Sequence, residues 1–295
     1  MSDGRGRPGD RGAIFFLTDY GQQDELAGVV RAVLVRLAPG APVVDLTHEV
    51  PAFDVRAGAL ALERATPHLG PGVVLAVVDP GVGSARRAVA LTVGHPGGPR
   101  ALVGPDNGLL VPAAEALGGA GAAVVLPQAA AEDRVTFDGR DVFAPAAAAL
   151  WGGTPLASLG APLPPGNLVR LPEPRLEVGG DAIEAEVLWI DRFGNVQLAA
   201  TVADARAAGL RPGATVEVGA AGVSRPAVVV RAFADLQEAG AAGDLGLLVD
   251  ANGHLALVCH RDAAATVLGV QAADTVTVRR HGGGSPSGPS TGSPP

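Results

Sequence analysis

The sequence is poor in several residue types, and each shortage excludes a class of protein. Its single cysteine, Cys259, rules out an internal disulfide and a cysteine-rich metal site. Aromatic residues make up only 3% of the 295 positions, so the core must consist mainly of Ala, Val and Leu. The 22 basic residues are outnumbered by 30 acidic ones. Because phosphate binding needs clustered Lys and Arg, the net charge of -8 argues against a nucleic acid partner.

Long hydrophobic runs and paired histidines are also missing. No run reaches the roughly 18 apolar residues of a membrane span, so we expect no membrane association. The first twelve residues, MSDGRGRPGDRG, lack the apolar segment of a signal peptide, and we expect a cytoplasmic protein. None of the six histidines has a partner at the i, i+4 spacing of a helical zinc site, so we predict no metal.

The first half of the chain alternates apolar runs with helical patterns. The runs AIFFL, PVVDL and VVLAVV are typical of strands, and the last, apolar throughout, suits a central parallel strand. Apolar residues at helical spacing predict a helix over 26–37, and Asp54 can cap a second one. Residues 13–160 are therefore predicted to form a layered α/β domain with a mostly parallel sheet.

The pattern changes after a proline-rich stretch. We expect a flexible leader at 1–12, a linker at 161–180 and a disordered Gly/Ser/Pro tail at 281–295. Residues 181–280 contain short β-type runs separated by Gly and Asp turns. They predict a smaller C-terminal β-barrel or sandwich.

Acidic turns follow several of the apolar runs in the first half. Open α/β sheets bind ligands beyond the carboxyl ends of their strands, so such turns indicate a polar site. Asp19 in TDYG is either a turn carboxylate or an acceptor for a ribose diol. Asp79 in DPGVG can pair with Arg86, more readily than with Arg87, in a structural or a functional ion pair. Asp138 lies among polar residues before an alanine-rich helix.

Three other segments contain acidic residues whose structural or functional role is less clear from the sequence. We interpret Pro105-Asp106-Asn107-Gly108 as a structural turn, and Asp141 as a possible cap of the alanine-rich helix. In IDRFGN, Phe193 can stack on a planar ring and Asn195 can hydrogen-bond an adenine edge in a bidentate way, while Asp191 can hold an ammonium group. The alternative for this segment is a plain β-turn.

Seven motifs in order resemble one family. They are similar to segments of the S-adenosyl-L-methionine hydroxide adenosyltransferases, relatives of the adenosyl fluorinase and chlorinase, over about residues 13–278. The motifs are TDYG, VVDLTHEVPAFDVRAGALAL, VVDPGVGSARR, VGPDNG, TFDGRDVFAPAAA, IDRFGN and LGLLVDANGHLAL.

The resemblance implies an activity and an assembly. Water or hydroxide would attack C5′ of S-adenosyl-L-methionine, giving adenosine and L-methionine without a cofactor. The protein would be a homotrimer, with each active site between the N-terminal domain of one subunit and the C-terminal domain of its neighbour.

The resemblance also assigns substrate-binding roles. Asp19 would bind the ribose hydroxyls, and Phe53 would line the ribose and sulfonium pocket. Asp191 would hold the methionine ammonium, while Phe193 and Asn195 would contact adenine. The segment containing Ala251 and Asn252 would approach the methionine carboxylate, partly through backbone groups.

The catalytic set departs from the family pattern at one position. Family members resemble one another in an Asp–Arg–His set, of which Asp79 and Arg86 match the first two members. The third lies in TFHGRD, but this chain has TFDGRD, so Asp138 replaces the histidine. A free carboxylate, with a pKa of about 4, is a weaker base at neutral pH than histidine. We hypothesise that Asp138 accepts a hydrogen bond from the attacking water.

Two other functions compete with hydrolysis. The altered set would also suit a non-catalytic protein that binds S-adenosyl-L-methionine or adenosine. A halogenase is the second rival, but Asp79 would repel a halide, and Gly139 offers no hydroxyl where the halide-binding serine of those enzymes would fall.

Overall fold

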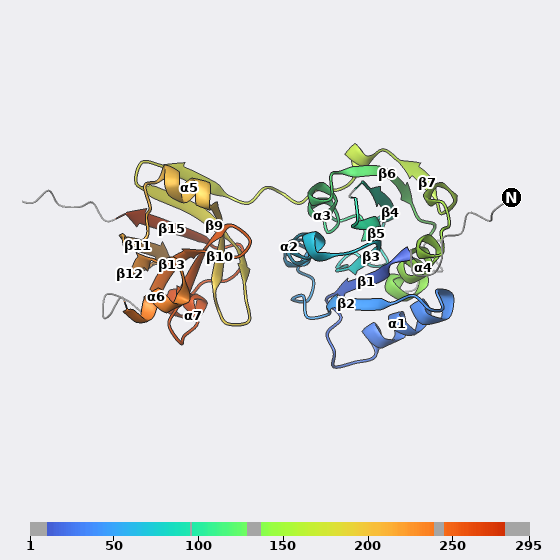
Figure 1. Cartoon of the computed structure of the whole chain (residues 1–295), viewed down its shortest axis with the longest axis horizontal. Helices are drawn as coiled ribbons and strands as arrows, with labels where there is room; N and C mark the ends of the chain where they lie inside the picture. The colour runs from blue at the N-terminus through green and yellow to red at the C-terminus, as the bar shows by residue number, and fades with distance from the viewer. Residues whose placement is uncertain (1–10, 95, 129–136, 239–244, 281–295) are drawn as a thin grey trace, which may run out of the picture. The chain divides into compact units, whose positions relative to one another are not determined.

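The chain forms two compact units that divide after Pro172. The computed structural model describes residues 11–94, 96–128, 137–238 and 245–280, and the units comprise residues 1–172 and 173–295 (Figure 1). Most of the predicted leader and the whole predicted tail lie outside the described residues. Within the described part of the chain, no helix is long and apolar enough to cross a membrane.

The first unit is built on a seven-stranded sheet, and its mostly parallel strands confirm the predicted α/β class. Its strand order is β2-β1-β3-β5-β4-β6-β7, and the four neighbours β2, β1, β3 and β5 are mutually parallel, whereas β4 runs against β5 and β6. The strands are β1 (Ala13–Thr18), β2 (Val43–Thr47), β3 (Gly72–Val77), β4 (Ala88–Val93), β5 (Pro99–Pro105), β6 (Ala120–Val125) and β7 (Ala161–Leu163).

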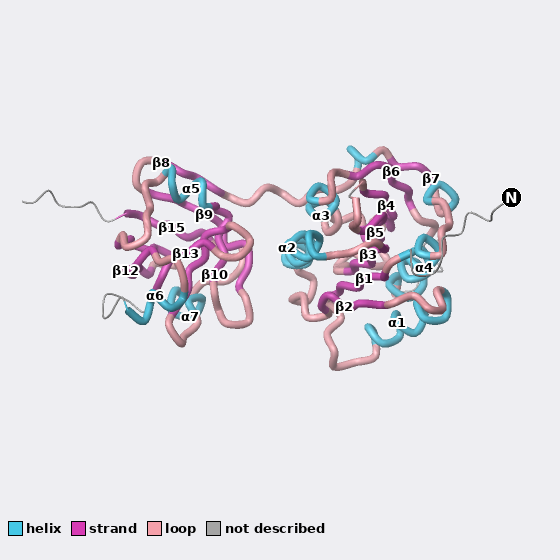
Figure 2. The backbone as a smooth tube through the Cα atoms, viewed as in Figure 1, coloured by secondary structure: helices cyan, strands magenta, loops and turns pink. Residues whose placement is uncertain are grey.

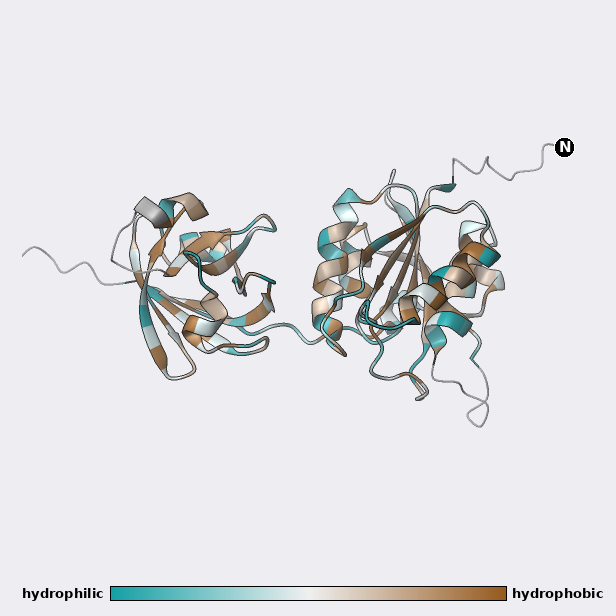
Figure 3. Cartoon of the chain, turned by 90° about the horizontal axis from the view of Figure 1, so that it is seen from below, coloured by the Kyte–Doolittle hydropathy of each residue, from teal (hydrophilic) through white to brown (hydrophobic). Residues whose placement is uncertain are grey.

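Helices cover both faces of this sheet. α1 (Leu26–Leu37) packs on α4 (Ala144–Trp151), and α2 (Val55–Ala65) packs on α3 (Val111–Ala116). Figure 3 shows the apolar strands between these two helical layers. Because β3 is covered on both sides, all six of its residues are buried, which explains its unbroken apolar sequence. Asp54 caps α2 as predicted, since its carboxylate accepts the Ala57 N–H at 2.9 Å.

The second unit is a closed β-barrel. Seven strands follow one another in the order β10-β14-β13-β12-β11-β15-β9, and pairing of β9 with β10 closes the ring, with β8 attached to β9. The elements are β8 (Leu176–Gly179), β9 (Ala182–Ile190), β10 (Val196–Thr201), α5 (Val202–Ala207), β11 (Thr215–Ala220), β12 (Val223–Val229), α6 (Phe233–Glu238), β13 (Leu245–Val249), β14 (His254–Cys259), α7 (Ala264–Leu268) and β15 (Thr275–Arg280).

The segment predicted as a linker contributes to both units. β7 pairs with β6 at the edge of the first sheet, and β8 pairs with β9 on the barrel. Only the stretch between them, 164–175, lacks strand structure, although it includes a short 3₁₀ turn at Pro165–Asn167 (Figure 2).

Candidate active site

Asp79, Arg86 and Asp138 come together beyond one edge of the first sheet. Asp79 follows the carboxyl end of β3, and Arg86 precedes β4, which runs in the opposite direction and therefore starts at that same edge. Arg86 Nε donates to Asp79 Oδ1 at 3.0 Å, and its Nη2 donates to Asp79 Oδ2 and, at 2.8 Å, to Asp138 Oδ2. The side chains of Asp79, Arg86 and Asp138 expose only 6%, 8% and 9% of their surfaces. The result is a largely buried carboxylate–guanidinium–carboxylate cluster.

Neighbouring groups hold this cluster in place. Gln128 Nε2 donates to Asp138 Oδ2 at 3.1 Å, so this oxygen accepts two hydrogen bonds. The Arg86 guanidinium also lies over the Phe143 ring, 5.4 Å from its centroid, and donates from Nη1 to the Arg87 carbonyl at 3.1 Å. Among the described residues, both hydrogen bonds to the Asp138 carboxylate from other side chains go to Oδ2.

Asp138 immediately precedes a π-helical turn, Gly139–Phe143, that leads into α4. A Cβ atom at Gly139 would collide with the Tyr20 hydroxyl, so a side chain cannot fit there without displacing Tyr20. Tyr20 in turn packs edge-on against Phe137. The phenol hydroxyl therefore lies next to the backbone that carries Asp138.

Burial sets the protonation properties of the cluster. It raises the pKa of Asp79, and the neighbouring Asp138 adds to the rise, while Arg86 opposes it. Burial also raises the pKa of Tyr20 well above its usual value, helped by the charges of Asp19, Asp79 and Asp138. Tyr20 is therefore a neutral hydroxyl, able to donate a hydrogen bond at any physiological pH.

Asp19 follows β1 at the same sheet edge and is tied to Phe53. Its Oδ2 accepts the Phe53 N–H at 2.9 Å, and burial raises its pKa. Phe53 adopts a φ of 67° and exposes 70% of its surface. A left-handed conformation is costly for an aromatic residue and is often found at functional sites. The structure thus brings together the two residues that the family resemblance assigns to the ribose end of the substrate.

In the second unit, the IDRFGN segment forms the turn between β9 and β10. Asp191 Oδ1 accepts the N–H groups of Phe193 and Asn195 at 2.8 and 3.0 Å, and Asp191 Oδ2 accepts Asn195 Nδ2 at 2.7 Å. Gly194 takes a φ of 80° and approaches Ala263 so closely that a side chain is excluded. Asn195 Nδ2 uses one of its two N–H groups in the bond to Asp191.

Phe193 and Asn195 line an open hollow of about 650 Å³ on this unit. Phe233, which the sequence analysis did not single out, lies on the same hollow and is 53% exposed, beside Phe193 at 70%. Two exposed aromatic rings and an amide around one hollow suit a planar heterocycle. The remaining lining residues are Cys259, Arg261, Asp262 and Ala263.

The segment with Ala251 and Asn252 forms the turn between β13 and β14. The Asp250 carboxylate organises it, since Oδ1 accepts the N–H groups of Asn252 and His254 at 2.8 and 3.1 Å. Gln197, buried on β10, donates to the other Asp250 oxygen. Ala251 and Asn252 are exposed, and the Asn252 N–H is engaged by the Asp250 carboxylate.

Two other predictions concern structural roles. Asp106 has one, as expected: it pairs with Arg87 and accepts the Val169 N–H at 2.8 Å. The predicted capping by Asp141 is wrong, because its carboxylate accepts both Nε and Nη2 of Arg140 at 2.7 Å, and within the described residues α4 has no side-chain cap. Among the described residues, no group of three or more His, Cys, Asp or Glu side chains could hold a metal ion.

Sequence reasoning missed Gln128, Tyr20, Gln197 and Phe233. Gln197 carries a signal in hindsight, as the one amide in the apolar run VQLAAT, and Tyr20 stands inside the TDYG motif. Gln128 and Phe233 lie in segments without a recognisable pattern, so only the tertiary structure connects them to the site.

The fold and these clusters define a class: a two-domain protein with a carboxylate-rich site at the strand ends of an α/β sheet and an aromatic hollow on a β-barrel. The N-terminal domain of the SAM hydroxide adenosyltransferases matches residues 14–160, and the C-terminal domain matches residues 185–277. The chain therefore belongs to the S-adenosyl-L-methionine (SAM) hydroxide adenosyltransferase family.

Individual relatives agree with this assignment. The chain is 47% identical to the (R)-S-adenosyl-L-methionine hydrolase of Salinispora arenicola, covering 90% of this chain and 97% of the relative. A fluorinase of Actinoplanes is 28% identical over the same share of each chain. An uncharacterised conserved protein from Thermotoga maritima has a similar crystal structure, with a TM-score of 0.78 and 32% identity, over 90% of this chain and 100% of that one.

Proposed function

We propose that this protein hydrolyses S-adenosyl-L-methionine to adenosine and L-methionine. The observation that carries the proposal is the buried Asp79–Arg86–Asp138 cluster at the sheet edge that also holds Asp19. The hydrolase name of relatives at 42–47% identity gives the substrate and the reaction.

The reaction is a displacement at carbon. A water oxygen forms a bond to C5′ while the bond from C5′ to the sulfonium sulfur breaks, and its electron pair goes to sulfur. Methionine therefore leaves as a neutral thioether and needs no acid. The water loses one proton, which a carboxylate takes and passes to solvent. No cofactor enters this balance.

The charge of the cluster suits both the cationic sulfonium of the substrate and the proton that the attacking water releases. Two carboxylates around one guanidinium carry a net negative charge, which attracts the sulfonium and disfavours an anionic nucleophile such as a halide. Arg86 and Gln128 fix Asp138 Oδ2, so Asp138 Oδ1 can accept a hydrogen bond from water in a defined orientation. The raised pKa of Asp79 makes it a better proton acceptor than a free carboxylate.

Other residues hold the substrate in this proposal. Asp19 accepts the ribose hydroxyls beside Phe53, while Phe193 and Phe233 stack on adenine and Asn195 Oδ1 accepts from its amino group. Asp191 neutralises the methionine ammonium, and the backbone at Ala251 and Asn252 meets the methionine carboxylate. These roles come from the family resemblance and are supported by the exposed rings and the ordered turns.

The proposal includes a homotrimer. One substrate molecule needs the residues of both units, and the family resemblance supplies them from neighbouring subunits. A native mass three times the 29.3 kDa of the chain, measured by light scattering after size exclusion, is the expected result.

The experiment that tests the function is incubation of the purified protein with S-adenosyl-L-methionine, with and without chloride, followed by chromatography. Adenosine and methionine should appear together, independently of chloride. Saturable binding without product would instead identify a binding protein, and a 5′-chloro nucleoside would identify a halogenase.

Variants at position 138 test the water-activating role. Asp138→Asn should lower kcat by about a hundredfold, because general bases contribute on that order. Asp138→His should keep activity and raise it near neutral pH. Full turnover by Asp138→Asn would show that this carboxylate does not activate water.

A further inference from the structure

A second hollow on the barrel unit differs in chemistry from the aromatic one. It encloses about 530 Å³, within the size range of small-molecule sites, and shares no lining residue with the aromatic hollow. Its walls come from α5, the segment before β11, and strands β12, β13 and β14. We call it the arginine-rimmed hollow; it is lined by Val202, Ala205, Arg206, Leu210, Arg211, Pro212, Val229, Val230, Arg231, Leu247, Leu248, Val249 and Leu255.

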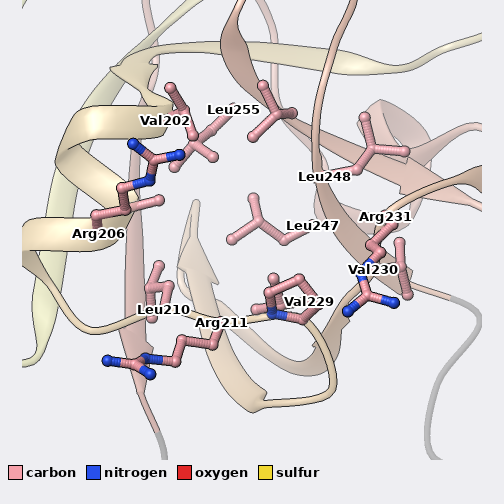
Figure 4. A pocket seen from close by; sticks show the side chains of 13 residues that line it. Val202, Arg206, Leu210, Arg211, Val229, Val230, Arg231, Leu247, Leu248 and Leu255 are labelled. Atoms are coloured by element: carbon pink, nitrogen blue, oxygen red, sulfur yellow. The ribbon is translucent and has the colours of Figure 1, made fainter.

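The walls of this hollow are aliphatic. Figure 4 shows leucine and valine side chains around an open space, with Leu247 at its centre. Leu247 and Leu255 are buried, whereas Val202 and Val249 expose 37% and 40% of their surfaces at the mouth. An aliphatic body entering the hollow would remove this apolar surface from water, which favours binding.

Three arginines provide the only charges among the lining residues. Arg206 and Arg211 lie on one side of the hollow, and Arg231 lies on the other (Figure 4). All three are exposed, and no described residue forms an ion pair or a side-chain hydrogen bond with their guanidinium groups. The nearby Asp235 carboxylate accepts the backbone N–H groups of Arg231 and Ala232. The rim therefore offers positive charge that the described part of the chain does not neutralise.

We propose that the arginine-rimmed hollow binds an aliphatic carboxylate, with its chain against the leucines and its carboxylate on the arginines. Guanidinium groups suit a carboxylate because they can donate two parallel hydrogen bonds to it. The aliphatic walls, without an aromatic ring or an acidic residue, disfavour a nucleobase and a cation. None of its lining residues is assigned to S-adenosyl-L-methionine, and Val249 lies two positions before Ala251.

Calorimetric titration of the full-length protein with decanoate, compared with decanol, tests the proposal. Decanoate should bind at least about tenfold more tightly, the difference expected for one charge-assisted hydrogen bond. The triple variant Arg206→Gln, Arg211→Gln, Arg231→Gln should lose this preference and bind decanol unchanged. Arg225→Gln, an exposed arginine on β12 outside the hollow, is the matched control and should bind both like the unmodified protein.

A filling variant tests the aliphatic part. Val249→Trp should abolish binding of both probes, whereas Val44→Trp, a similarly exposed valine in the first unit, should not. Saturating adenosine and methionine should leave decanoate binding unchanged, whether or not the protein has hydrolase activity. Equal binding of decanol and decanoate, or displacement of decanoate by adenosine, would overturn the proposal. Absence of decanoate binding would also overturn it, and a changed native mass of the triple arginine variant would then assign the hollow to a contact between copies of the chain.

Discussion

At the residue scale, the positive charge of Arg86 stabilises two buried carboxylates, Asp79 and Asp138. Removing it in Arg86→Gln leaves Asp79 and Asp138 close together without a cation, and breaking such a buried arrangement costs about 3–5 kcal/mol. We expect a loss of that order in the free energy of unfolding at pH 7, measured by urea denaturation, together with loss of turnover.

The destabilisation caused by Arg86→Gln should change with pH in a definite direction. Without Arg86 the folded state holds protons on the carboxylates more strongly than the unfolded chain does, so the destabilisation should shrink as pH falls from 7 toward 5. Arg170→Gln breaks an exposed pair with Glu115 and should cost under about 1 kcal/mol at either pH. A destabilisation of Arg86→Gln that grows on acidification would contradict the assigned electrostatics.

Tyr20 permits a direct measurement, because it is the only tyrosine in the chain. Burial and three nearby carboxylates raise its pKa, so the folded protein should show no phenolate absorbance near pH 10, where free tyrosine titrates. The raised pKa makes the neutral phenol a source of stability that is complete below about pH 10 and is lost as pH rises further. Tyr20→Phe should therefore remove part of the alkaline destabilisation. Normal titration of the folded protein would show that Tyr20 is exposed to solvent.

At the element scale, the π-helical turn Gly139–Phe143 places Asp138 against Arg86. A Cβ atom at Gly139 would collide with the Tyr20 hydroxyl, so Gly139→Ala should cost about 1–3 kcal/mol as overpacking. It should also lower kcat by shifting Asp138. Tyr20→Phe removes the hydroxyl and should restore most of both losses in the double variant. Additive losses in a double-mutant cycle would refute the contact.

Elements with a strong local pattern could be predicted from the sequence, and those that depend on distant partners could not. The period of Leu26–Leu37 and the cap at Asp54 predict α1 and α2, because both signals lie within a few residues. The π-helical turn has no such signal. Asp141 resembles a helix cap in sequence, but the adjacent Arg140 forms two hydrogen bonds with it instead. Pairing of Asp79 with Arg86 could be predicted because a short loop connects them, whereas Gln128 contacts Asp138 only through the tertiary fold.

At the scale of the whole molecule, the sequence predicts an α/β domain followed by a β domain, but it does not predict that the strands of the second domain close into a barrel. Short alternating runs are equally typical of a sandwich and a barrel. The choice depends on long-range pairing, because β9, already paired with its hairpin neighbour β10, also pairs with the distant β15. Likewise, the insertion of β5 between β3 and β4 follows from parallel and antiparallel pairing and not from any local motif. The antiparallel direction of β4 is what places its start, with Arg86, at the same sheet edge as the end of β3, with Asp79.

If each active site lies between two subunits of the proposed trimer, two inactive variants should restore activity when mixed, which would not happen if each site lay within one chain. Asp79→Asn damages the first unit and Asn195→Ala the second, so each variant alone should lack turnover. Mixed in equal amounts, unfolded and refolded together, they should form trimers in which about a quarter of the sites combine two undamaged units, as expected for a ring of head-to-tail contacts. Activity should return toward that fraction, measured as adenosine release. A mixture of Asp79→Asn with Arg86→Gln, both in the first unit, should stay inactive. Failure of the first mixture despite a trimeric native mass would place each complete site within one chain.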